Sequence, residues 1–236
     1  MCTVVLRIAA GGVVLAANRD EMAERPWDPP AAWWPDQPGI VGGRDRLAGG
    51  TWLAINARGV VAGVLNRVGS LGPAPGKRSR GELPLLVLQH ETAAEAAKAA
   101  AGLDAGAWRS FNLVLADRSG AWFVRGLGAG KPDGWALTEG VHMVTAHDPD
   151  DLDSPRVARH LPRFRAAPAP GHADWCAWRS ILADDTGPEG TELNVPLRAG
   201  FGTVSAAMIF LNSPPAWLFA PGPPNRAVFS PVPLPR

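Results

Sequence analysis

The second residue of the chain, Cys2, is the side chain best suited to covalent chemistry. It follows an initiator methionine, which is usually removed when the next residue is small, so we expect a mature chain that begins with cysteine. The thiol is a strong nucleophile, and a free α-amine with a pKa of roughly 7.7–8.0 can act as its general base near neutral pH. The alternative is that Cys2 is a small apolar residue at the start of a strand.

The residues after Cys2 predict a β-hairpin that returns three polar side chains to it. Two runs rich in β-branched residues flank a Gly-Gly pair at positions 11–12, which suits a two-residue turn. Because a hairpin folds back on itself, Asn18, Arg19 and Asp20 at the end of the second strand should lie beside Cys2. Arg19 can lower the pKa of the thiol or bind an anionic group, and Asp20 can orient the amine.

The Met-Cys-Thr start and the Asn18-Arg19-Asp20-Glu21 tetrapeptide resemble the NRDE family, which includes the transport-and-Golgi-organisation proteins. Further similar segments follow along the chain: Gly49 to Leu53, Asn56 to Gly59, Ser79 to Gly81, Phe111 to Leu113, and Gly202-Thr203. The family is in turn similar to N-terminal-nucleophile (Ntn) hydrolases of the choloylglycine hydrolase and penicillin V acylase type. The resemblance implies an α+β fold, the four-layer αββα sandwich of these hydrolases, over a single domain, 1–236.

The resemblance also implies roles for residues further along the chain. Asn66, at the end of a predicted hairpin over 51–65, matches an oxyanion-hole asparagine, and the loss of one such donor costs roughly 2.7–4 kcal/mol. The alternative is that Asn66 caps the end of a strand. Asn18, Trp52 and Asn112 lie in the matching motifs and are the candidate substrate-binding residues.

Three positions depart from the hydrolase pattern. The arginine that precedes Asn-x-Asp in the hydrolases is Ala17 here, and Arg19 replaces it two positions on, on the same face of the strand. No asparagine occurs in 144–147, where the hydrolases carry one, and Val204 replaces a late-strand arginine. A nucleophile, its base and one oxyanion donor are therefore matched, whereas two supporting groups are not.

Two functions of different classes follow from the resemblance. The first is acyl transfer to water, in which an amide or thioester of a small acyl substrate is attacked by Cys2. The second is a non-catalytic carrier or chaperone for a hydrophobic anionic ligand such as haem or an acyl lipid, because eukaryotic members are linked to haem mobilisation and lipid metabolism. Cys2 would then be a haem-iron thiolate or a structural residue. A hydrolase of this type needs the free amine at Cys2, and a carrier does not.

Composition favours a protein without nucleic-acid or membrane partners. The net charge is +1, and no segment approaches the roughly 18 uninterrupted apolar residues of a membrane span. We expect no signal peptide, a reducing cytoplasmic compartment and a buried core thiol at Cys176. We also expect no metal and no resident cofactor, since the spacing of His142 and His147 is poor for ligands and the acidic stretch 148–153 suits a solvated loop.

The remaining pattern predicts hairpins early and late in the chain with helices between them, which suits an α+β protein. Helices are expected over 82–90, 92–101, 156–164 and 175–183, the second of them opened by a capping box at Thr92. Further strands are expected over 112–116, 121–124, 141–145, 203–211 and 217–220. The tryptophan-rich segment near 25–35 is expected to be a packed loop that covers a sheet edge.

Overall fold

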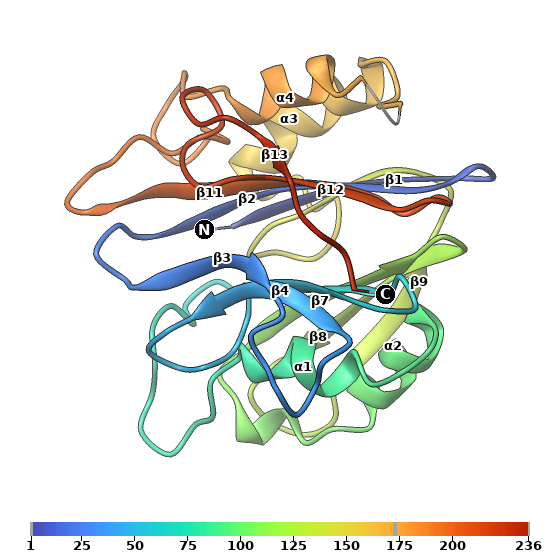
Figure 1. Cartoon of the computed structure of the whole chain (residues 1–236). Coiled ribbons are helices and arrows are strands. Elements are labelled where there is room, and N and C mark those ends of the chain that lie inside the picture. Colours follow the sequence, from blue (N-terminus) through green and yellow to red (C-terminus); the bar gives the residue numbers. More distant parts are fainter. Residues whose placement is uncertain (1, 172–173, 236) are drawn as a thin grey trace. The chain divides into compact units, whose positions relative to one another are not determined.

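The computed structural model describes residues 2–171 and 174–235 and divides into two compact units. Unit 1 combines Met1–Arg25 with Glu139–Val232, and unit 2 combines Pro26–Thr138 with Pro233–Arg236. Each unit is built on one antiparallel sheet that packs against helices of the same unit (Figure 1). The expected mixture of hairpins and helices is therefore present in both units.

Unit 1 contains a sheet with the strand order β10-β1-β2-β11-β12-β13. Its strands are β1 (Thr3–Ala9), β2 (Gly12–Met22), β10 (Gly140–Val144), β11 (Phe201–Phe210), β12 (Ala216–Ala220) and β13 (Ser230–Pro231). Its helices are α3 (Pro155–Ala166) and α4 (Cys176–Leu182). The long strand β2 lies between β1 and β11, so residues far apart in the sequence meet along it.

The first hairpin forms as predicted, with its turn one residue earlier than expected. β1 pairs with β2 from Thr3 opposite Asn18 to Ala9 opposite Gly12, so the turn is Ala10-Gly11. Gly12 has a φ of +120°, and a Cβ atom there would lie 1.4 Å from the side-chain oxygen of Asn212. Glycine is therefore needed at position 12 for its conformation and for the close approach of Asn212.

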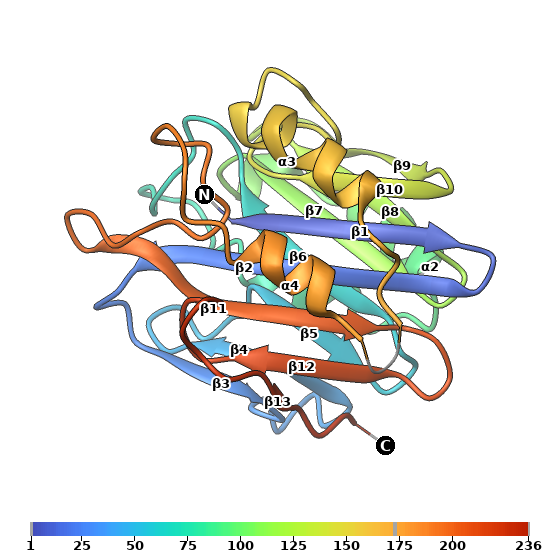
Figure 2. The same cartoon turned by 90° about the horizontal axis from the view of Figure 1, so that it is seen from above.

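One face of the unit 1 sheet is covered by α3 and α4. Side chains that alternate along the strands, including Val5, Val14 and Ala16, pack against Val157 and Trp178 of the helices. Figure 2 shows both helices lying across this sheet. Thr3 is two residues from Val5 and Asn18 two from Ala16, so their side chains fall on the same helix-covered face.

Unit 2 contains a sheet with the strand order β3-β4-β5-β6-β7-β8-β9. Its strands are β3 (Trp27–Ala31), β4 (Ile40–Asp45), β5 (Leu53–Asn56), β6 (Val61–Asn66), β7 (Phe111–Asp117), β8 (Gly120–Gly126) and β9 (Asp133–Leu137). Its helices are α1 (Glu82–Val87), α2 (Ala93–Ala101) and the short 3-10 helix η1 (Ala105–Ala107). The capping box at the start of α2 is confirmed, because Thr92 and Glu95 each bond to the other's backbone N–H.

Strands β3 and β4 were missed because their residue types are unusual for a sheet. β3 contains two prolines and was predicted to be a loop, but it is an edge strand whose register shifts between Asp28 and Ala31. β4 contains Gly42 and Gly43, where a Cβ atom would lie 2.6 Å from that of Ala54 and 2.3 Å from the Trp52 ring. The glycines therefore allow a close approach within a sheet.

Candidate functional site

The sulfur of Cys2 lies beside the end of β2, as the hairpin argument predicts. It is 3.7 Å from the backbone carbonyl oxygen of Asp20, to which the thiol donates. Burial raises the pKa of the Cys2 thiol above its ordinary value, and the negative charge of Asp20 raises it further. The positive charge of Arg19 acts in the expected direction and favours the thiolate, but it is outweighed. Cys2 is therefore a protonated thiol at neutral pH that needs a base.

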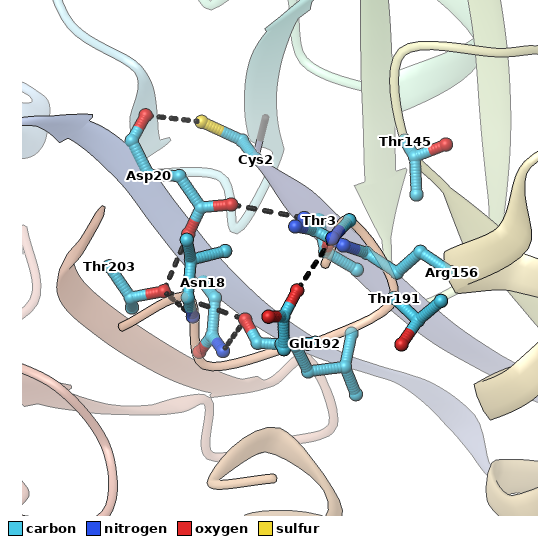
Figure 3. Close-up of polar contacts among 12 residues, drawn as sticks. Cys2, Thr3, Asn18, Asp20, Thr145, Arg156, Thr191, Glu192 and Thr203 are labelled. Atoms are coloured by element: carbon cyan, nitrogen blue, oxygen red, sulfur yellow. Dashed lines mark hydrogen bonds and ion pairs between the residues drawn. The ribbon is translucent and has the colours of Figure 1, made fainter. Parts of the chain in front are cut away.

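The carboxylate of Asp20 is buried and held by two other elements of unit 1 (Figure 3). Oδ2 accepts a hydrogen bond from Nη1 of Arg156 at 3.0 Å, and Oδ1 accepts one from the hydroxyl of Thr203 at 2.6 Å. Thr203 lies opposite Asp20 in the β2–β11 pairing, and its hydroxyl also accepts from the backbone N–H of Val195 at 2.8 Å. These bonds fix the carboxylate, whereas the thiol contacts the main chain of the same residue.

Arg156 is a site residue that the sequence analysis missed. It is 5% exposed in the first turn of α3, which Ser154 caps by accepting from the N–H of Val157. The same Nη1 that contacts Asp20 also donates to the Thr3 hydroxyl at 3.1 Å. One guanidinium therefore joins the residue after Cys2 to the end of β2.

Asn18 stabilises the backbone around this site. Its buried Nδ2 group donates to the carbonyl oxygens of Leu182, at the end of α4, and Leu193, both at 2.9 Å. These bonds use both amide hydrogens. The substrate-binding role predicted for Asn18 stays a prediction, and the contacts observed are structural.

Arg19 lies on the opposite face of β2 from Asn18 and Asp20, because side chains alternate along a strand. It is 6% exposed, and its Nη2 lies 3.6 Å from a carboxylate oxygen of Glu21. Arg19 therefore contributes a buried positive charge on the face that carries no helix. Its predicted role in binding an anionic group stays a prediction.

Unit 2 carries the other predicted residues, Asn66, Asn112 and Trp52. Asn66 is half-buried at the end of β6, opposite Phe111, whose side chain packs in the helix-covered core of this unit. Asn112 follows Phe111 and so lies on the other face, where its Oδ1 accepts from Nη1 of Arg67 at 2.6 Å. The oxyanion-donor role of Asn66 and the substrate-binding role of Asn112 stay predictions.

Trp52 lies immediately before β5 and packs against other aromatic and backbone groups of unit 2. Its ring meets that of Trp27 edge to face, with centroids 5.7 Å apart, and lies over Gly43. Trp52 thus shields the β3–β4 edge of the sheet. Its predicted contact with substrate stays a prediction.

Cys176 is exposed, so the prediction of a buried core thiol is wrong. The buried side chains around α4 are Trp175, Trp178, Ile181 and Leu182, which are spaced three or four residues apart on one helix face, and Cys176 falls outside that face. The flanking tryptophans indicated burial, but the helical period places Cys176 on the solvent side.

The histidines and the acidic loop after β10 form ion pairs and hydrogen bonds with each other. His142 Nδ1 lies 2.8 Å from Asp150, which also accepts from Arg165 at 3.1 Å, and His147 Nδ1 lies 3.4 Å from Asp151. Among residues 2–171 and 174–235 no group of three or more His, Cys, Asp or Glu side chains is arranged to hold a metal ion. In the same part of the chain, no helix is both long and apolar enough to cross a membrane.

Comparison with known families identifies the chain. Residues 1–168, most of its length, match the family model "Transport and Golgi organisation 2". The chain belongs to the transport and Golgi organisation 2 family. It is 33% identical over 110 residues to the mouse "Transport and Golgi organization 2 homolog" and 33% identical over 141 residues to the human "Transport and Golgi organization protein 2 homolog". These matches cover 45% and 56% of this chain, and the chain spans only 39% and 50% of those relatives.

Solved structures of acylases share the fold of this family member. An N-acylethanolamine-hydrolyzing acid amidase orthologue from Caenorhabditis elegans has a TM-score of 0.62 at 12% identity, covering 89% of this chain and 92% of the other. A conjugated bile acid hydrolase from Clostridium perfringens has a TM-score of 0.58 at 11% identity (98% and 92% covered), and penicillin V acylase from Agrobacterium tumefaciens one of 0.55 at 15% (94% and 83% covered). These likenesses confirm the predicted Ntn-hydrolase fold class.

Proposed function

We propose that this family member is an N-terminal-cysteine acyl hydrolase that cleaves an amide or a thioester of a small acyl substrate. The observation that carries the proposal is the contact of the Cys2 sulfur with the Asp20 carbonyl, at the end of a strand whose Asn-Arg-Asp sequence matches the acylase pattern. The solved relatives of this fold are named as an amidase, an acylase and a hydrolase, which supports the same class of reaction.

In the proposed reaction the Cys2 sulfur attacks the carbonyl carbon of the substrate. The tetrahedral intermediate collapses, the amine or thiol leaves with a proton, and the acyl group stays on sulfur as a thioester. Water then attacks this thioester, releases the carboxylic acid and restores the thiol. Arg19 binds an anionic group of the substrate, and Asn66 is assigned to the oxyanion by the family resemblance alone.

The proposal requires removal of Met1, which lies outside the described residues. Because burial and Asp20 raise the pKa of the Cys2 thiol, the attack needs a base to take the thiol proton. An α-amine on Cys2, with a pKa of roughly 7.7–8.0, is suited to this task near neutral pH. Intact-mass measurement of the purified protein shows whether the methionine is lost.

The test compares Cys2→Ala and Cys2→Ser with a matched Cys176→Ala variant on a panel of acyl amides and acyl thioesters. The hydrolase predicts that both Cys2 variants fold and lose nearly all turnover, whereas Cys176→Ala turns substrate over like the parent. Turnover that survives in Cys2→Ala contradicts the mechanism. A parent protein that turns over no substrate, but binds haem or an acyl lipid equally well with and without the Cys2 thiol, supports the carrier function instead.

A further inference from the structure

The guanidinium of Arg156 makes two contacts that nothing in the hairpin motif anticipates. Its Nη1 lies 3.0 Å from the Asp20 carboxylate and 3.1 Å from the Thr3 hydroxyl. The arginine and Asp20 are 6% and 0% exposed at their side chains, so this ion pair is shielded from water and salt. A charge pair of this kind acts strongly on any group close to it.

Cys2 is such a group, because it precedes Thr3 and contacts the carbonyl of Asp20. The charged side chains that act on the thiol in the described part of unit 1 are Asp20 and Arg19 of β2. Arg156 of α3 contacts Asp20 and reaches the thiol only through that carboxylate. The segment after β10 adds no charge at Thr145 and Ala146, and His147, which follows them, pairs with Asp151.

We propose that Arg156 is a positioning residue for the Cys2 nucleophile: it fixes the Asp20 carboxylate, balances its charge and ties it to the residue next to the thiol. The proposal rests on the proposed role of Cys2 and adds a group from a helix that begins more than 130 residues further along the chain. Two observations argue for a directed contact. The same Nη1 bridges Thr3 and Asp20, and the Thr203 hydroxyl completes the carboxylate from the other side.

The electrostatic consequence has a definite sign. The negative charge of Asp20 raises the pKa of the Cys2 thiol, second only to burial. Removing the Arg156 charge leaves the carboxylate unbalanced and should raise the pKa further, whereas removing the Asp20 charge should lower it. A residue that served packing alone would not produce opposite shifts in the two variants.

The experiment follows alkylation of Cys2 by iodoacetamide as a function of pH, using peptide mass spectrometry on the full chain. Exposed Cys176 serves as the reference thiol in the same molecule. The variants are Arg156→Met, Arg156→Lys, Asp20→Asn and the double variant Asp20→Asn/Arg156→Met. Arg163→Met is the matched control, because Arg163 is on the same helix but pairs with Asp184. Circular dichroism and thermal melting establish that each variant is folded.

We expect the alkylation midpoint of Cys2 to rise by about half a pH unit or more in Arg156→Met, which corresponds to about threefold slower reaction below the midpoint. Arg156→Lys should stay closer to the parent and Asp20→Asn should shift downward. The double variant should match Asp20→Asn, because Arg156 acts through the carboxylate. Arg163→Met should match the parent.

An unchanged Cys2 profile in folded Arg156→Met overturns the proposal, as does an equal shift in Arg156→Lys or in Arg163→Met. Removing one partner of a buried ion pair is strongly destabilising, so Arg156→Met alone could fail to fold. In that case Arg156→Gln, which keeps amide donors without the charge, is measured in its place, and an unchanged Cys2 profile there refutes the proposal. Different midpoints in Asp20→Asn and the double variant refute it as well, because Arg156 should have no effect once the carboxylate is gone. The assay needs no substrate, so its outcome is independent of whether the chain hydrolyses acyl compounds.

Discussion

His160 makes the stability of unit 1 sensitive to mildly acidic pH. It is fully buried on α3, where its Nε2 donates to the carbonyl oxygen of Thr191 at 2.7 Å and its Nδ1 accepts from Arg163 at 2.9 Å. Burial, together with the charges of Arg163 and Arg159, lowers the pKa of His160 from 6.5 to about 4. The folded chain therefore holds a neutral imidazole with one fixed tautomer.

The sign of the pH dependence follows from this lowered pKa. The unfolded chain takes up a proton on His160 at higher pH than the folded chain does, so stability is lost as pH falls from the unfolded to the folded value. A difference of this size corresponds to about 3 kcal/mol in total, of which about 1.4 kcal/mol is lost by about pH 5.5 and about 2.6 kcal/mol by about pH 4.5. The pKa values of Asp150 and Glu192 are lowered from ordinary carboxyl values, so their contributions are lost at lower pH.

The assay is urea denaturation of the parent and of His160→Gln across this pH window. A glutamine amide can still donate to the Thr191 carbonyl but does not titrate. We expect the free energy of unfolding of the parent to fall by about 2.6 kcal/mol more than that of the variant between neutral pH and about pH 4.5. Parallel curves for the two proteins would refute the reasoning, because the acid sensitivity would then belong to other groups.

Three further predictions concern the thiols, the amide donor and the buried carboxylate. Cys176 should be alkylated faster than Cys2 at neutral pH, because it is exposed whereas the pKa of Cys2 is raised; peptide mapping that finds Cys2 faster contradicts this. Asn66→Ala should lower kcat about 100- to 1,000-fold if Asn66 binds the oxyanion, and equal kinetics in parent and variant exclude that role, with Asn112→Ala for comparison. Thr203→Val should cost about 2–3 kcal/mol in urea denaturation, because it leaves a buried carboxylate and a backbone N–H each one bond short. A smaller loss would mean that water replaces the hydroxyl.

Local pattern was enough to predict the first hairpin and the strand end that meets Cys2. The alternation of β-branched residues around positions 11–12 specifies a hairpin register, and register in turn decides which residues are neighbours. The same alternation places Arg19 on one face of β2 and Asn18 and Asp20 on the other. The sequence is therefore enough to predict which face of the strand each of these side chains lies on, as well as that this strand end lies near Cys2.

The features that were not predicted depend on contacts between residues distant in the sequence, or on segments whose residue pattern fits two structures. Arg156 is an ordinary arginine of an amphipathic helix by sequence, and its role depends on the packing of α3 against the β1–β2 end of the sheet. Cys176 was assigned from its tryptophan neighbours, although the period of α4 turns it to solvent. Strand β3 was not predicted because Pro29 and Pro30 are compatible with an edge strand and with a loop alike.

The contact of Arg156 with Asp20 bears on two of the departures from the hydrolase pattern. The resemblance to the hydrolases implies arginines at positions 17 and 204, where this chain carries Ala17 and Val204. A buried carboxylate such as Asp20 still requires a positive partner, since an unpaired buried charge is strongly unfavourable. Arg156 supplies that partner from a helix and not from a strand. The Asp20 carboxylate is therefore balanced in this chain although Ala17 and Val204 carry no charge.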